Sequence, residues 1–552
     1  MIGLCLVHPV HSEVGTAYSG IRAEGEVGRI VAERVAERLL VAETGKVLKV
    51  AFRLSPELRG DEAVVEVKSG SATVTGSRKR ALLFGAGVLL RQMRWNDGTF
   101  ELADGSCRFA PHGELRMAYW ARHFHNWYQM ADAAELRRYL EDLALWGVNA
   151  LYTQFLASIN FNDDFEKDPK AVLFMDNYAE VARLAKDLDL DVYSGAVFGN
   201  QGYRNTPAAI RAAKNRTDEH WRPDGGVNIC PYKPGAAEYV VRQGRKVLRE
   251  LERRGLKWDG FGFWPYDEGG CGCTNCAPWG GNGYVKLIAS AMPHLRKHNP
   301  DLKVMVSTWY FGPSDWMSFY AWLGRRTDVD YVLADECHLF GEYPRYPIEH
   351  PLPNGVKLVT FPEISMRGRY PWGGTGANPY PDYLAKMFAQ HEGKAVGFRY
   401  YSEGIYEDLN KAVVSMLYVD PRRPYEETLR EYARYEIGLR ETEKFVRFVK
   451  LLEKNLFIEK ATPADVEAAY ALARELDAEL APAFRTRWRW RVFYLRALID
   501  REWKRPGGGE HTPLNDAAYR ELVRLYYAGE SPETYRDDPL HEMVRPRAPA
   551  VE

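Results

Sequence analysis

The sequence lacks the features that would place a protein in a membrane or on a nucleic acid. No run of residues approaches the roughly 20 apolar residues that a membrane-spanning helix needs. The 74 Lys and Arg residues almost balance the 75 Asp and Glu residues. A balanced charge does not attract nucleic acid or an anionic lipid surface. We therefore expect a small or neutral ligand, with neither a nucleic-acid nor a membrane partner.

The amino terminus lacks the parts of a secretory signal. Residues 1–10 are apolar, but they have no basic n-region, no long apolar h-region and no small-residue cleavage site, and they are more typical of a β-strand. Cysteine is scarce, with an odd count of 7. Cys271, Cys273 and Cys276 are too closely spaced to form a disulfide framework. Both features favour a reducing, cytoplasmic location.

The length of 552 residues excludes a single hydrophobic core, because cores stop growing near roughly 250 to 300 residues. The sequence predicts a small α+β domain over residues 1–112, a barrel over residues 113–404 and an α-helical domain over residues 405–552. The helical domain could cover the barrel, complete its pocket or form a homodimer, and the sequence does not choose among these.

From Leu115 onward, candidate strands alternate with amphipathic helices, a pattern typical of βα units around a parallel sheet. The eight candidate strands are residues 115–120, 150–155, 191–197, 260–264, 303–309, 330–334, 357–361 and 395–400. Eight such units predict an α/β fold, the (β/α)8 TIM barrel. Helix-to-strand connections are short, whereas strand-to-helix connections are long and rich in Trp, Tyr, Gly and Asn. In this fold the active site lies at the mouth that the long loops form.

Four of the eight strands end in carboxylates. These are Asp267 and Glu268, Asp335 and Glu336, Glu363, and Glu403. Hydrolysis of a glycosidic bond needs such a set, because one acid protonates the leaving oxygen while a second group acts as nucleophile, base or substrate orienter. A single acid at such a junction is more often a helix cap or a solvated charge, but four together favour catalysis. We therefore expect a glycosidase.

Further candidates for substrate binding surround these acids. They are His123, His125, Asn126, Gln154, Trp264, Tyr266, Trp309, Tyr310, Glu336, Arg399, Tyr401 and Glu403. Aromatic residues make up 13% of the chain, and their flat faces suit the C–H faces of sugar rings, although ordinary packing explains many of them. Arg399 either pairs with a substrate carboxylate or balances the neighbouring acids.

Several motifs resemble known glycosidases. Residues 82–91 (LLFGAGVLLR) resemble the helix of the small α+β domain that precedes the barrel in glycoside hydrolase families 20, 67 and 84. Residues 123–126 and 140–151 resemble the first βα unit of those barrels, and adjacent Asp and Glu after the fourth strand are the family 20 signature. The resemblance implies a β-N-acetylhexosaminidase-like enzyme. Glu268 would then be the general acid/base, and Asp267 would orient a 2-acetamido group that is the substrate's own nucleophile.

Two other catalytic schemes remain open, because residues 264–266 (WPY) replace the His-x-Gly-Gly that leads into the family 20 pair. In an arrangement similar to family 67 α-glucuronidases, Glu268 is the acid, and Asp335 or Glu336 with Glu363 activates water. In the third scheme, Glu363 is a direct nucleophile opposite Glu268. A carboxyl separation near roughly 5 Å favours the direct nucleophile, and roughly 6.5 to 9.5 Å favours inversion. The long loops suit a pocket and exo action.

Two rival classes follow from other features of the sequence. The pair His123 and His125 is similar to the start of metal-dependent amidohydrolases, which share the barrel. Those sites also need a lysine on strand four and histidines after strands five and six, whereas strand four has no lysine and strand five ends in Trp309 and Tyr310. The second rival is a barrel that binds sugar without cleaving it.

Four cysteines are candidate metal ligands. Cys271, Cys273 and Cys276 follow the acid pair directly, and Cys230 lies in the preceding long loop. Four thiolates hold one tetrahedral zinc ion, and a closed four-sulfur site is structural because it leaves no open position for substrate. Reduced, packed thiols are the alternative. We expect no organic cofactor.

Overall fold

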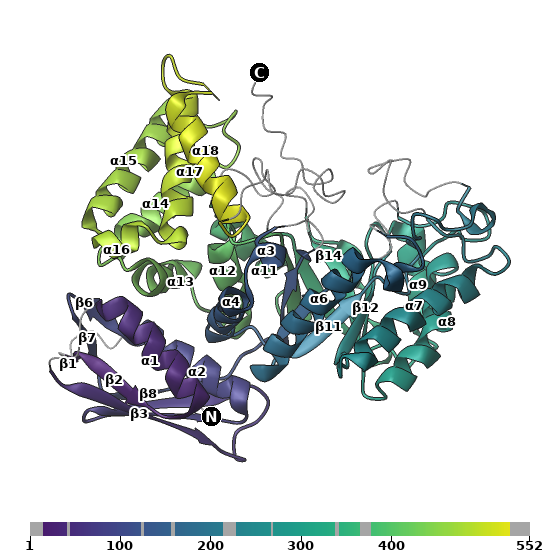
Figure 1. Cartoon of the computed structure of the whole chain (residues 1–552), viewed down its shortest axis with the longest axis horizontal. Coiled ribbons are helices and arrows are strands. Elements are labelled where there is room, and N and C mark those ends of the chain that lie inside the picture. Colours follow the sequence, from purple (N-terminus) through teal and green to yellow (C-terminus); the bar gives the residue numbers. More distant parts are fainter. Residues whose placement is uncertain are drawn as a thin grey trace.

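The computed structural model describes residues 15–40, 45–122, 126–155, 161–213, 228–265, 269–336, 342–364, 377–509 and 511–529. At its centre is a closed barrel of parallel strands (Figure 1) in the order β9 to β16, with β16 pairing back to β9. The strands are β9 (Leu115–Trp120), β10 (Ala150–Thr153), β11 (Asp191–Gly195), β12 (Gly260–Phe263), β13 (Lys303–Ser307), β14 (Tyr331–Glu336), β15 (Lys357–Pro362) and β16 (Ala395–Ser402). The predicted TIM barrel is confirmed, with every strand within a few residues of its predicted bounds.

Helices cover the outside of the barrel. They are α3 (Trp127–Met130), α4 (Ala133–Leu145), α6 (Pro169–Asp187), α7 (Ala236–Arg253), α8 (Gly283–His298), α9 (Pro313–Leu323), α10 (Arg345–Glu349), α11 (Pro381–His391) and α12 (Asp408–Val419). A capping box starts α4, where the Asp132 carboxylate accepts the backbone N–H of Glu135 and the Glu135 carboxylate accepts that of Asp132. Because α11 ends at His391 and β16 begins at Ala395, this helix-to-strand connection is short, as predicted.

The N-terminal region is an α+β unit. Its elements are β1 (Thr16–Tyr18), β2 (Gly20–Ala23), α1 (Gly25–Leu39), β3 (Val47–Leu54), β4 (Ala63–Lys68), β5 (Ser71–Gly76), α2 (Lys79–Gln92), β6 (Arg94–Asn96), β7 (Thr99–Leu102) and β8 (Gly105–Phe109). The main sheet has the order β2-β3-β5-β4-β8. Helix α2 lies against the barrel, because a Cβ at Gly87 would stand 1.8 Å from the carbonyl oxygen of Leu145 on α4. Only glycine permits this close approach.

The region after the barrel is helical, as predicted. It contains α13 (Tyr425–Tyr432), a π-helical turn (Ala433–Ile437), α14 (Thr442–Lys454), α15 (Pro463–Glu479), α16 (Pro482–Arg485), α17 (Trp488–Lys504) and α18 (Pro513–Tyr526). These helices lie above the N-terminal region, on the same side of the barrel (Figure 1). The domain boundaries at residues 112 and 404 stay predictions.

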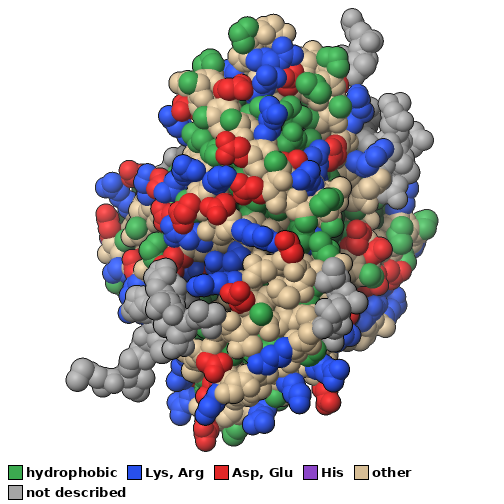
Figure 2. Space-filling model, turned by 90° about the vertical axis from the view of Figure 1, so that its left-hand side faces the viewer, with side chains coloured by type: hydrophobic (Ala, Val, Ile, Leu, Met, Phe, Trp, Pro, Cys, Tyr) green, Lys and Arg blue, Asp and Glu red, His purple; other side chains and the backbone are tan. Residues whose placement is uncertain are grey.

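The surface carries charges of both signs. On the face that Figure 2 shows, Lys and Arg side chains are interspersed with Asp and Glu, in keeping with the near-zero net charge. Among the residues that the structure describes, no helix is long and apolar enough to cross a membrane.

Candidate active site

The inward-facing side chains of the barrel follow the two-residue period of the strands. An apolar cluster of Tyr119, Tyr152, Tyr193, Met305, Tyr331, Leu333, Val359 and Phe361 fills the interior. On β15, Val359 and Phe361 belong to this cluster, and Glu363 is the next residue with the same alternation. On β16, the same alternation leads from Arg399 through Tyr401 to Glu403. The strands therefore bring Glu363 and Glu403 to the same end of the barrel, as the sequence predicts.

Tyr401 connects the two glutamates. Glu363 and Tyr401 form a parallel β-bridge, and the Tyr401 hydroxyl donates a hydrogen bond to Oε1 of Glu403. Both carboxylates are almost fully buried, with 5% of Glu363 and 1% of Glu403 exposed. Burial raises the pKa of Tyr401 well above its ordinary value, and the nearby charges of Glu403 and Glu363 raise it further. The phenol therefore stays protonated and remains a donor at neutral pH.

Aromatic rings form a wall that continues through Phe361 to Tyr401. The ring centroids of Trp264 and Trp309 are 5.0 Å apart, and those of Trp309 and Tyr310 are 4.9 Å apart. Trp264 and Tyr310 are partly exposed, whereas Trp309 is buried. Tyr310 has a φ of 59°, a left-handed conformation that bulky residues rarely adopt and that is often found at functional sites. The wall gives partly exposed ring faces on which a sugar could stack.

Arg399 lies in the barrel interior, one inward position before Tyr401. Its guanidinium carbon is 4.2 Å from the ring centroid of Tyr152 and 4.7 Å from that of Trp264. The residue is 1% exposed, and neither Nε nor Nη2 has a hydrogen-bond partner among the residues that the structure describes. Burial lowers the pKa of Arg399 because the charged form loses hydration. The guanidinium is thus held by aromatic faces, and two of its nitrogens have no acceptor in the described part of the chain.

Asn126 and Gln154 have different surroundings. Asn126 is fully buried, its Oδ1 accepts the backbone N–H of Tyr128 at 3.2 Å, and its Nδ2 donates to the carbonyl of Ala121 at 2.8 Å. Its side chain therefore caps helix α3. Gln154 follows β10, and its Nε2 donates to the Tyr152 hydroxyl at 2.9 Å.

The remaining predicted site residues cannot be placed with these. Asp267, Glu268, Tyr266, His123 and His125 lie outside the described residues. Asp335 and Glu336 are in strand β14, but their side chains lie outside the description too. Their catalytic and binding roles stay predictions.

The four predicted metal ligands come together. The Sγ atoms of Cys230, Cys271, Cys273 and Cys276 all lie within 4.8 Å of one another, and Cys230 Sγ is 3.8 Å from the Sγ atoms of both Cys273 and Cys276. Sulfurs at the corners of a zinc tetrahedron with Zn–S bonds of about 2.3 Å stand roughly 3.8 Å apart. Hydrogen bonds from the neighbouring thiols, Cys276 foremost, lower the pKa of Cys271. This group of cysteines could bind a metal.

The cysteine cluster joins two loops beside the barrel. Cys230 lies between β11 and α7, and the other three lie between β12 and α8. Gly270, just before Cys271, has a φ of 98°, and a Cβ there would stand 2.3 Å from the buried indole of Trp279. The backbone at this position therefore packs directly against Trp279, and a side chain there would displace the indole.

Sequence reasoning missed a group of buried polar residues behind Glu403. Glu407 accepts hydrogen bonds from the backbone N–H groups of Glu403 and Gly404, and Lys411 donates one to the carbonyl of Gly404. One signal was available, because Lys411 lies in the first turn of helix α12, directly before its largely apolar run over residues 412–419. A cation beside such a run is buried only when it has partners.

Comparisons with known proteins give a fold. The sequence matches no family model, and no curated protein matches it. A family 89 glycoside hydrolase from Clostridium perfringens has a TM-score of 0.58 at 14% identity, and the match covers 86% of this chain but only 60% of the Clostridium enzyme. A family 115 4-O-methyl-α-glucuronidase, specific for decorated arabinogalactans, has a TM-score of 0.58 at 10% identity. That match covers 92% of this chain and 75% of the glucuronidase.

A family 20 exo-β-N-acetylglucosaminidase from Vibrio harveyi is also similar. Its TM-score is 0.51 at 12% identity, and the match covers 78% of this chain and 76% of the Vibrio enzyme. The chain shares the fold of these glycoside hydrolases. The relation to family 20 that the sequence motifs implied is thus confirmed for the fold. At 10 to 14% identity, the similarity shows the fold alone.

Proposed function

We propose that the protein is an exo-acting glycoside hydrolase of the β-N-acetylhexosaminidase type. Glu268 is the proton donor, and Asp267 orients the 2-acetamido group of the substrate. Glu363 supports them electrostatically from strand β15. Trp264, Trp309 and Tyr310 supply the stacking surface for the sugar, and Gln154 and Glu403 bind its hydroxyl groups.

The observation that carries this proposal is the pair Glu363 and Glu403, joined through Tyr401 beside an aromatic wall in a TIM barrel. Paired carboxylates with flat aromatic faces are what glycoside hydrolysis requires. The similar structures come from four families of glycoside hydrolases, which supports a glycosidase. One of them is named an exo-β-N-acetylglucosaminidase, and the family 89 enzyme has also been solved with its substrate GlcNAc-α-1,4-galactose, which supports the acetamido sugar.

A panel of aryl glycosides tests the function. It holds 4-nitrophenyl β-N-acetylglucosaminide, β-N-acetylgalactosaminide, β-galactoside and α-glucuronide, each assayed with the parent and with Glu268→Gln. We expect cleavage of an N-acetylhexosaminide, with kcat/KM lower in the variant by roughly 100-fold or more. A near-parental rate in Glu268→Gln would remove Glu268 from the mechanism. Sugar binding with no turnover by either protein would support the binding-only barrel.

An anionic sugar is the second candidate substrate, and Arg399 favours it. Within the described residues, Nε and Nη2 of its buried guanidinium have no acceptor, and this pair of nitrogens suits a carboxylate, which binds arginine through two parallel hydrogen bonds. The similar family 115 enzyme is named as an α-glucuronidase. In this scheme Glu268 is the acid, and Glu363 activates water or attacks directly. Cleavage of the α-glucuronide alone in the panel would establish this candidate over the first.

We also propose that Cys230, Cys271, Cys273 and Cys276 hold one structural zinc ion. The sulfur spacing and the donor set support this assignment. A zinc ion held there would link the loops after β11 and β12 and restrain the segment that follows Glu268. All four positions would be sulfur, so the ion would take no part in the chemistry.

A further inference from the structure

Glu403 is carried by a short connection. Strand β16 ends at Ser402 and helix α12 begins at Asp408, so only a tight turn separates them. Every residue of this turn is buried, from Glu403 at 1% exposed to Glu407 at 2%. A buried turn must find partners inside the protein for its backbone N–H and C=O groups.

The Glu407 carboxylate supplies acceptors for the turn. Its Oε1 accepts the backbone N–H of Glu403 at 2.8 Å and that of Gly404 at 3.1 Å. The same oxygen accepts the hydroxyl of Ser402 at 2.9 Å. One carboxylate oxygen therefore fixes three successive residues, with Glu403 in the middle.

Lys411 holds the other side of the turn. Its Nζ donates to the carbonyl of Gly404 at 2.6 Å, to the Tyr128 hydroxyl at 2.6 Å and to the Tyr139 hydroxyl at 2.7 Å. An ammonium group has three donors, and each is used. The single proton of the Tyr128 hydroxyl can reach either the Ser402 hydroxyl or the carbonyl of Gly404, which closes the network around the turn.

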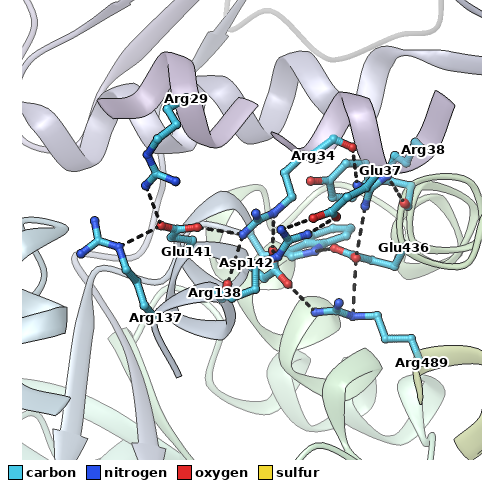
Figure 3. A network of polar contacts seen from close by, with 12 residues as sticks. Arg29, Arg34, Glu37, Arg38, Arg137, Arg138, Glu141, Asp142, Glu436 and Arg489 are labelled. Carbon is cyan, nitrogen blue, oxygen red and sulfur yellow. Dashed lines mark hydrogen bonds and ion pairs between the residues drawn. The ribbon is translucent and has the colours of Figure 1, made fainter. Parts of the chain in front are cut away.

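The network continues into the helical region. Tyr139 donates to Oδ1 of Asp408 at 2.6 Å, and Arg489 of α17 donates to Oδ2 of the same carboxylate at 2.8 Å. Figure 3 shows Arg489 reaching Asp142 of α4 while Arg34 of α1 reaches the same carboxylate from the other side, with donor distances of 2.9 and 2.8 Å. The strand β16 turn is thus connected by buried charges to both flanking regions.

We propose that Glu407 and Lys411 are positioning residues that hold the backbone of Glu403 in place at the barrel mouth, with Asp408 and Arg489 tying this support to the helical region. The inference rests on the proposed function, because it treats Glu403 as a sugar-binding residue. Neither Glu407 nor Lys411 touches the sugar in this scheme. A buried ionic network is a costly way to stabilise a turn, and buried charges of this kind are often retained for specificity of conformation.

Hydrogen–deuterium exchange measures the positioning directly. In the parent, the amides of Glu403 and Gly404 are expected to exchange slowly because both donate to Glu407. Exchange in the peptide that contains them should accelerate about tenfold in Glu407→Gln, since a neutral acceptor binds more weakly than a carboxylate. Exchange of the same peptide should also accelerate in Lys411→Met, and this variant provides the test if Glu407→Gln does not fold. Unchanged exchange in the folded variants would overturn the proposal.

Glu431→Gln is the matched control. Glu431 is also a poorly exposed carboxylate in ion pairs, 2.8 Å from Arg423 and 3.1 Å from Arg91. It lines a cavity with Gly393, which precedes β16 and so lies at the opposite end of the barrel. The exchange of the 402–404 backbone should stay at the parental rate in this variant. Equal acceleration in the control would show general loosening and contradict a specific role.

Kinetics give the second measurement, with the 4-nitrophenyl glycoside that the parent hydrolyses fastest. Glu407→Gln should lower kcat about tenfold while KM stays within about twofold of the parental value, because Glu403 is displaced but not removed. Unchanged kcat together with accelerated exchange would show that the turn does not act on catalysis and would also overturn the proposal. If the parent cleaves no glycoside, the proposed function fails, while the exchange experiment still decides the positioning.

Discussion

Glu363 and Tyr401 pair in parallel register at the ends of neighbouring strands, and the Tyr401 hydroxyl donates to Glu403. Tyr401 thus links the ends of the last two strands of the barrel, by its backbone to Glu363 and by its hydroxyl to Glu403. The main-chain carbonyl of Glu363 also accepts the Tyr380 hydroxyl at 3.0 Å. Tyrosines therefore hold the backbone of one acid and the carboxylate of the other.

The first prediction concerns the second catalytic group. We expect Asp267→Asn to lower kcat on an N-acetylhexosaminide by roughly 100-fold or more, because the acetamido group is then no longer oriented as nucleophile. Glu363→Gln should lower it only about tenfold. The exposed Glu392, just before β16, provides the control Glu392→Gln, which should behave as the parent. A loss in Glu363→Gln as large as that in Glu268→Gln would instead favour direct participation of Glu363.

The second prediction concerns the hydroxyl of Tyr401. Tyr401→Phe removes a donor to the buried Glu403 carboxylate, so the free energy of unfolding should fall by about 1 to 3 kcal/mol. Chemical denaturation measures the effect.

Tyr400 provides a control on the same strand. Its hydroxyl is buried and has no hydrogen-bond partner in the part of the chain that the structure describes, so Tyr400→Phe should leave stability almost unchanged. If the two variants lose equal stability, the Tyr401–Glu403 hydrogen bond contributes nothing beyond packing.

The third prediction concerns the metal. Protein purified without chelator should contain about one zinc per chain by elemental analysis, and its removal should lower the Tm by about 5 °C or more. Cys276→Ser should lose the zinc, because three sulfurs leave the tetrahedron incomplete. Cys107→Ser is the control, since Cys107 is buried in β8, outside the cluster. An absence of zinc with an unchanged Tm after chelation would show that the thiols are merely packed.

The fourth prediction follows from the pKa of Lys411. Burial lowers this pKa from its ordinary 10.5 to about 8, although the charges of Glu407 and Asp408 act in the opposite direction. The folded chain then releases the proton near pH 8, while the unfolded chain keeps it to about pH 10.5. Between these values the unfolded state binds more protons, so the free energy of unfolding rises with pH. The cost of the buried charge is fully present below about pH 8 and is relieved above it.

Lys411→Met isolates this effect. The difference in unfolding free energy between parent and variant should shift in favour of the parent by roughly 2 kcal/mol from pH 7 to pH 9.5. Urea denaturation at both pH values measures it. A difference that does not change with pH would place the proton release of Lys411 outside this interval. The other groups around Lys411 are Tyr128, Tyr139 and Arg489, and they are the same in both proteins.

The sequence by itself determined the barrel and the arrangement that brings Glu363 and Glu403 to one end of it. These follow from local patterns, since strand and helix periods, loop lengths and the alternation along β15 and β16 need no knowledge of distant residues. The grouping of Cys230 with Cys271, Cys273 and Cys276 was also foreseen, because consecutive βα loops meet at one end of a parallel barrel. The place of Asp267 and Glu268 at that mouth stays a prediction of the same kind.

Only the tertiary structure decided which polar groups share a hydrogen bond. Asn126 was a candidate for the substrate, and the fold turns its side chain to the cap of α3. Lys411 meets Tyr128 and Tyr139, and Arg489 meets Asp142, only because the barrel closes between β16 and β9 and the helical region returns to α4. Such partners are hundreds of residues apart, and their desolvation in a shared interior, which no local pattern encodes, sets their energies.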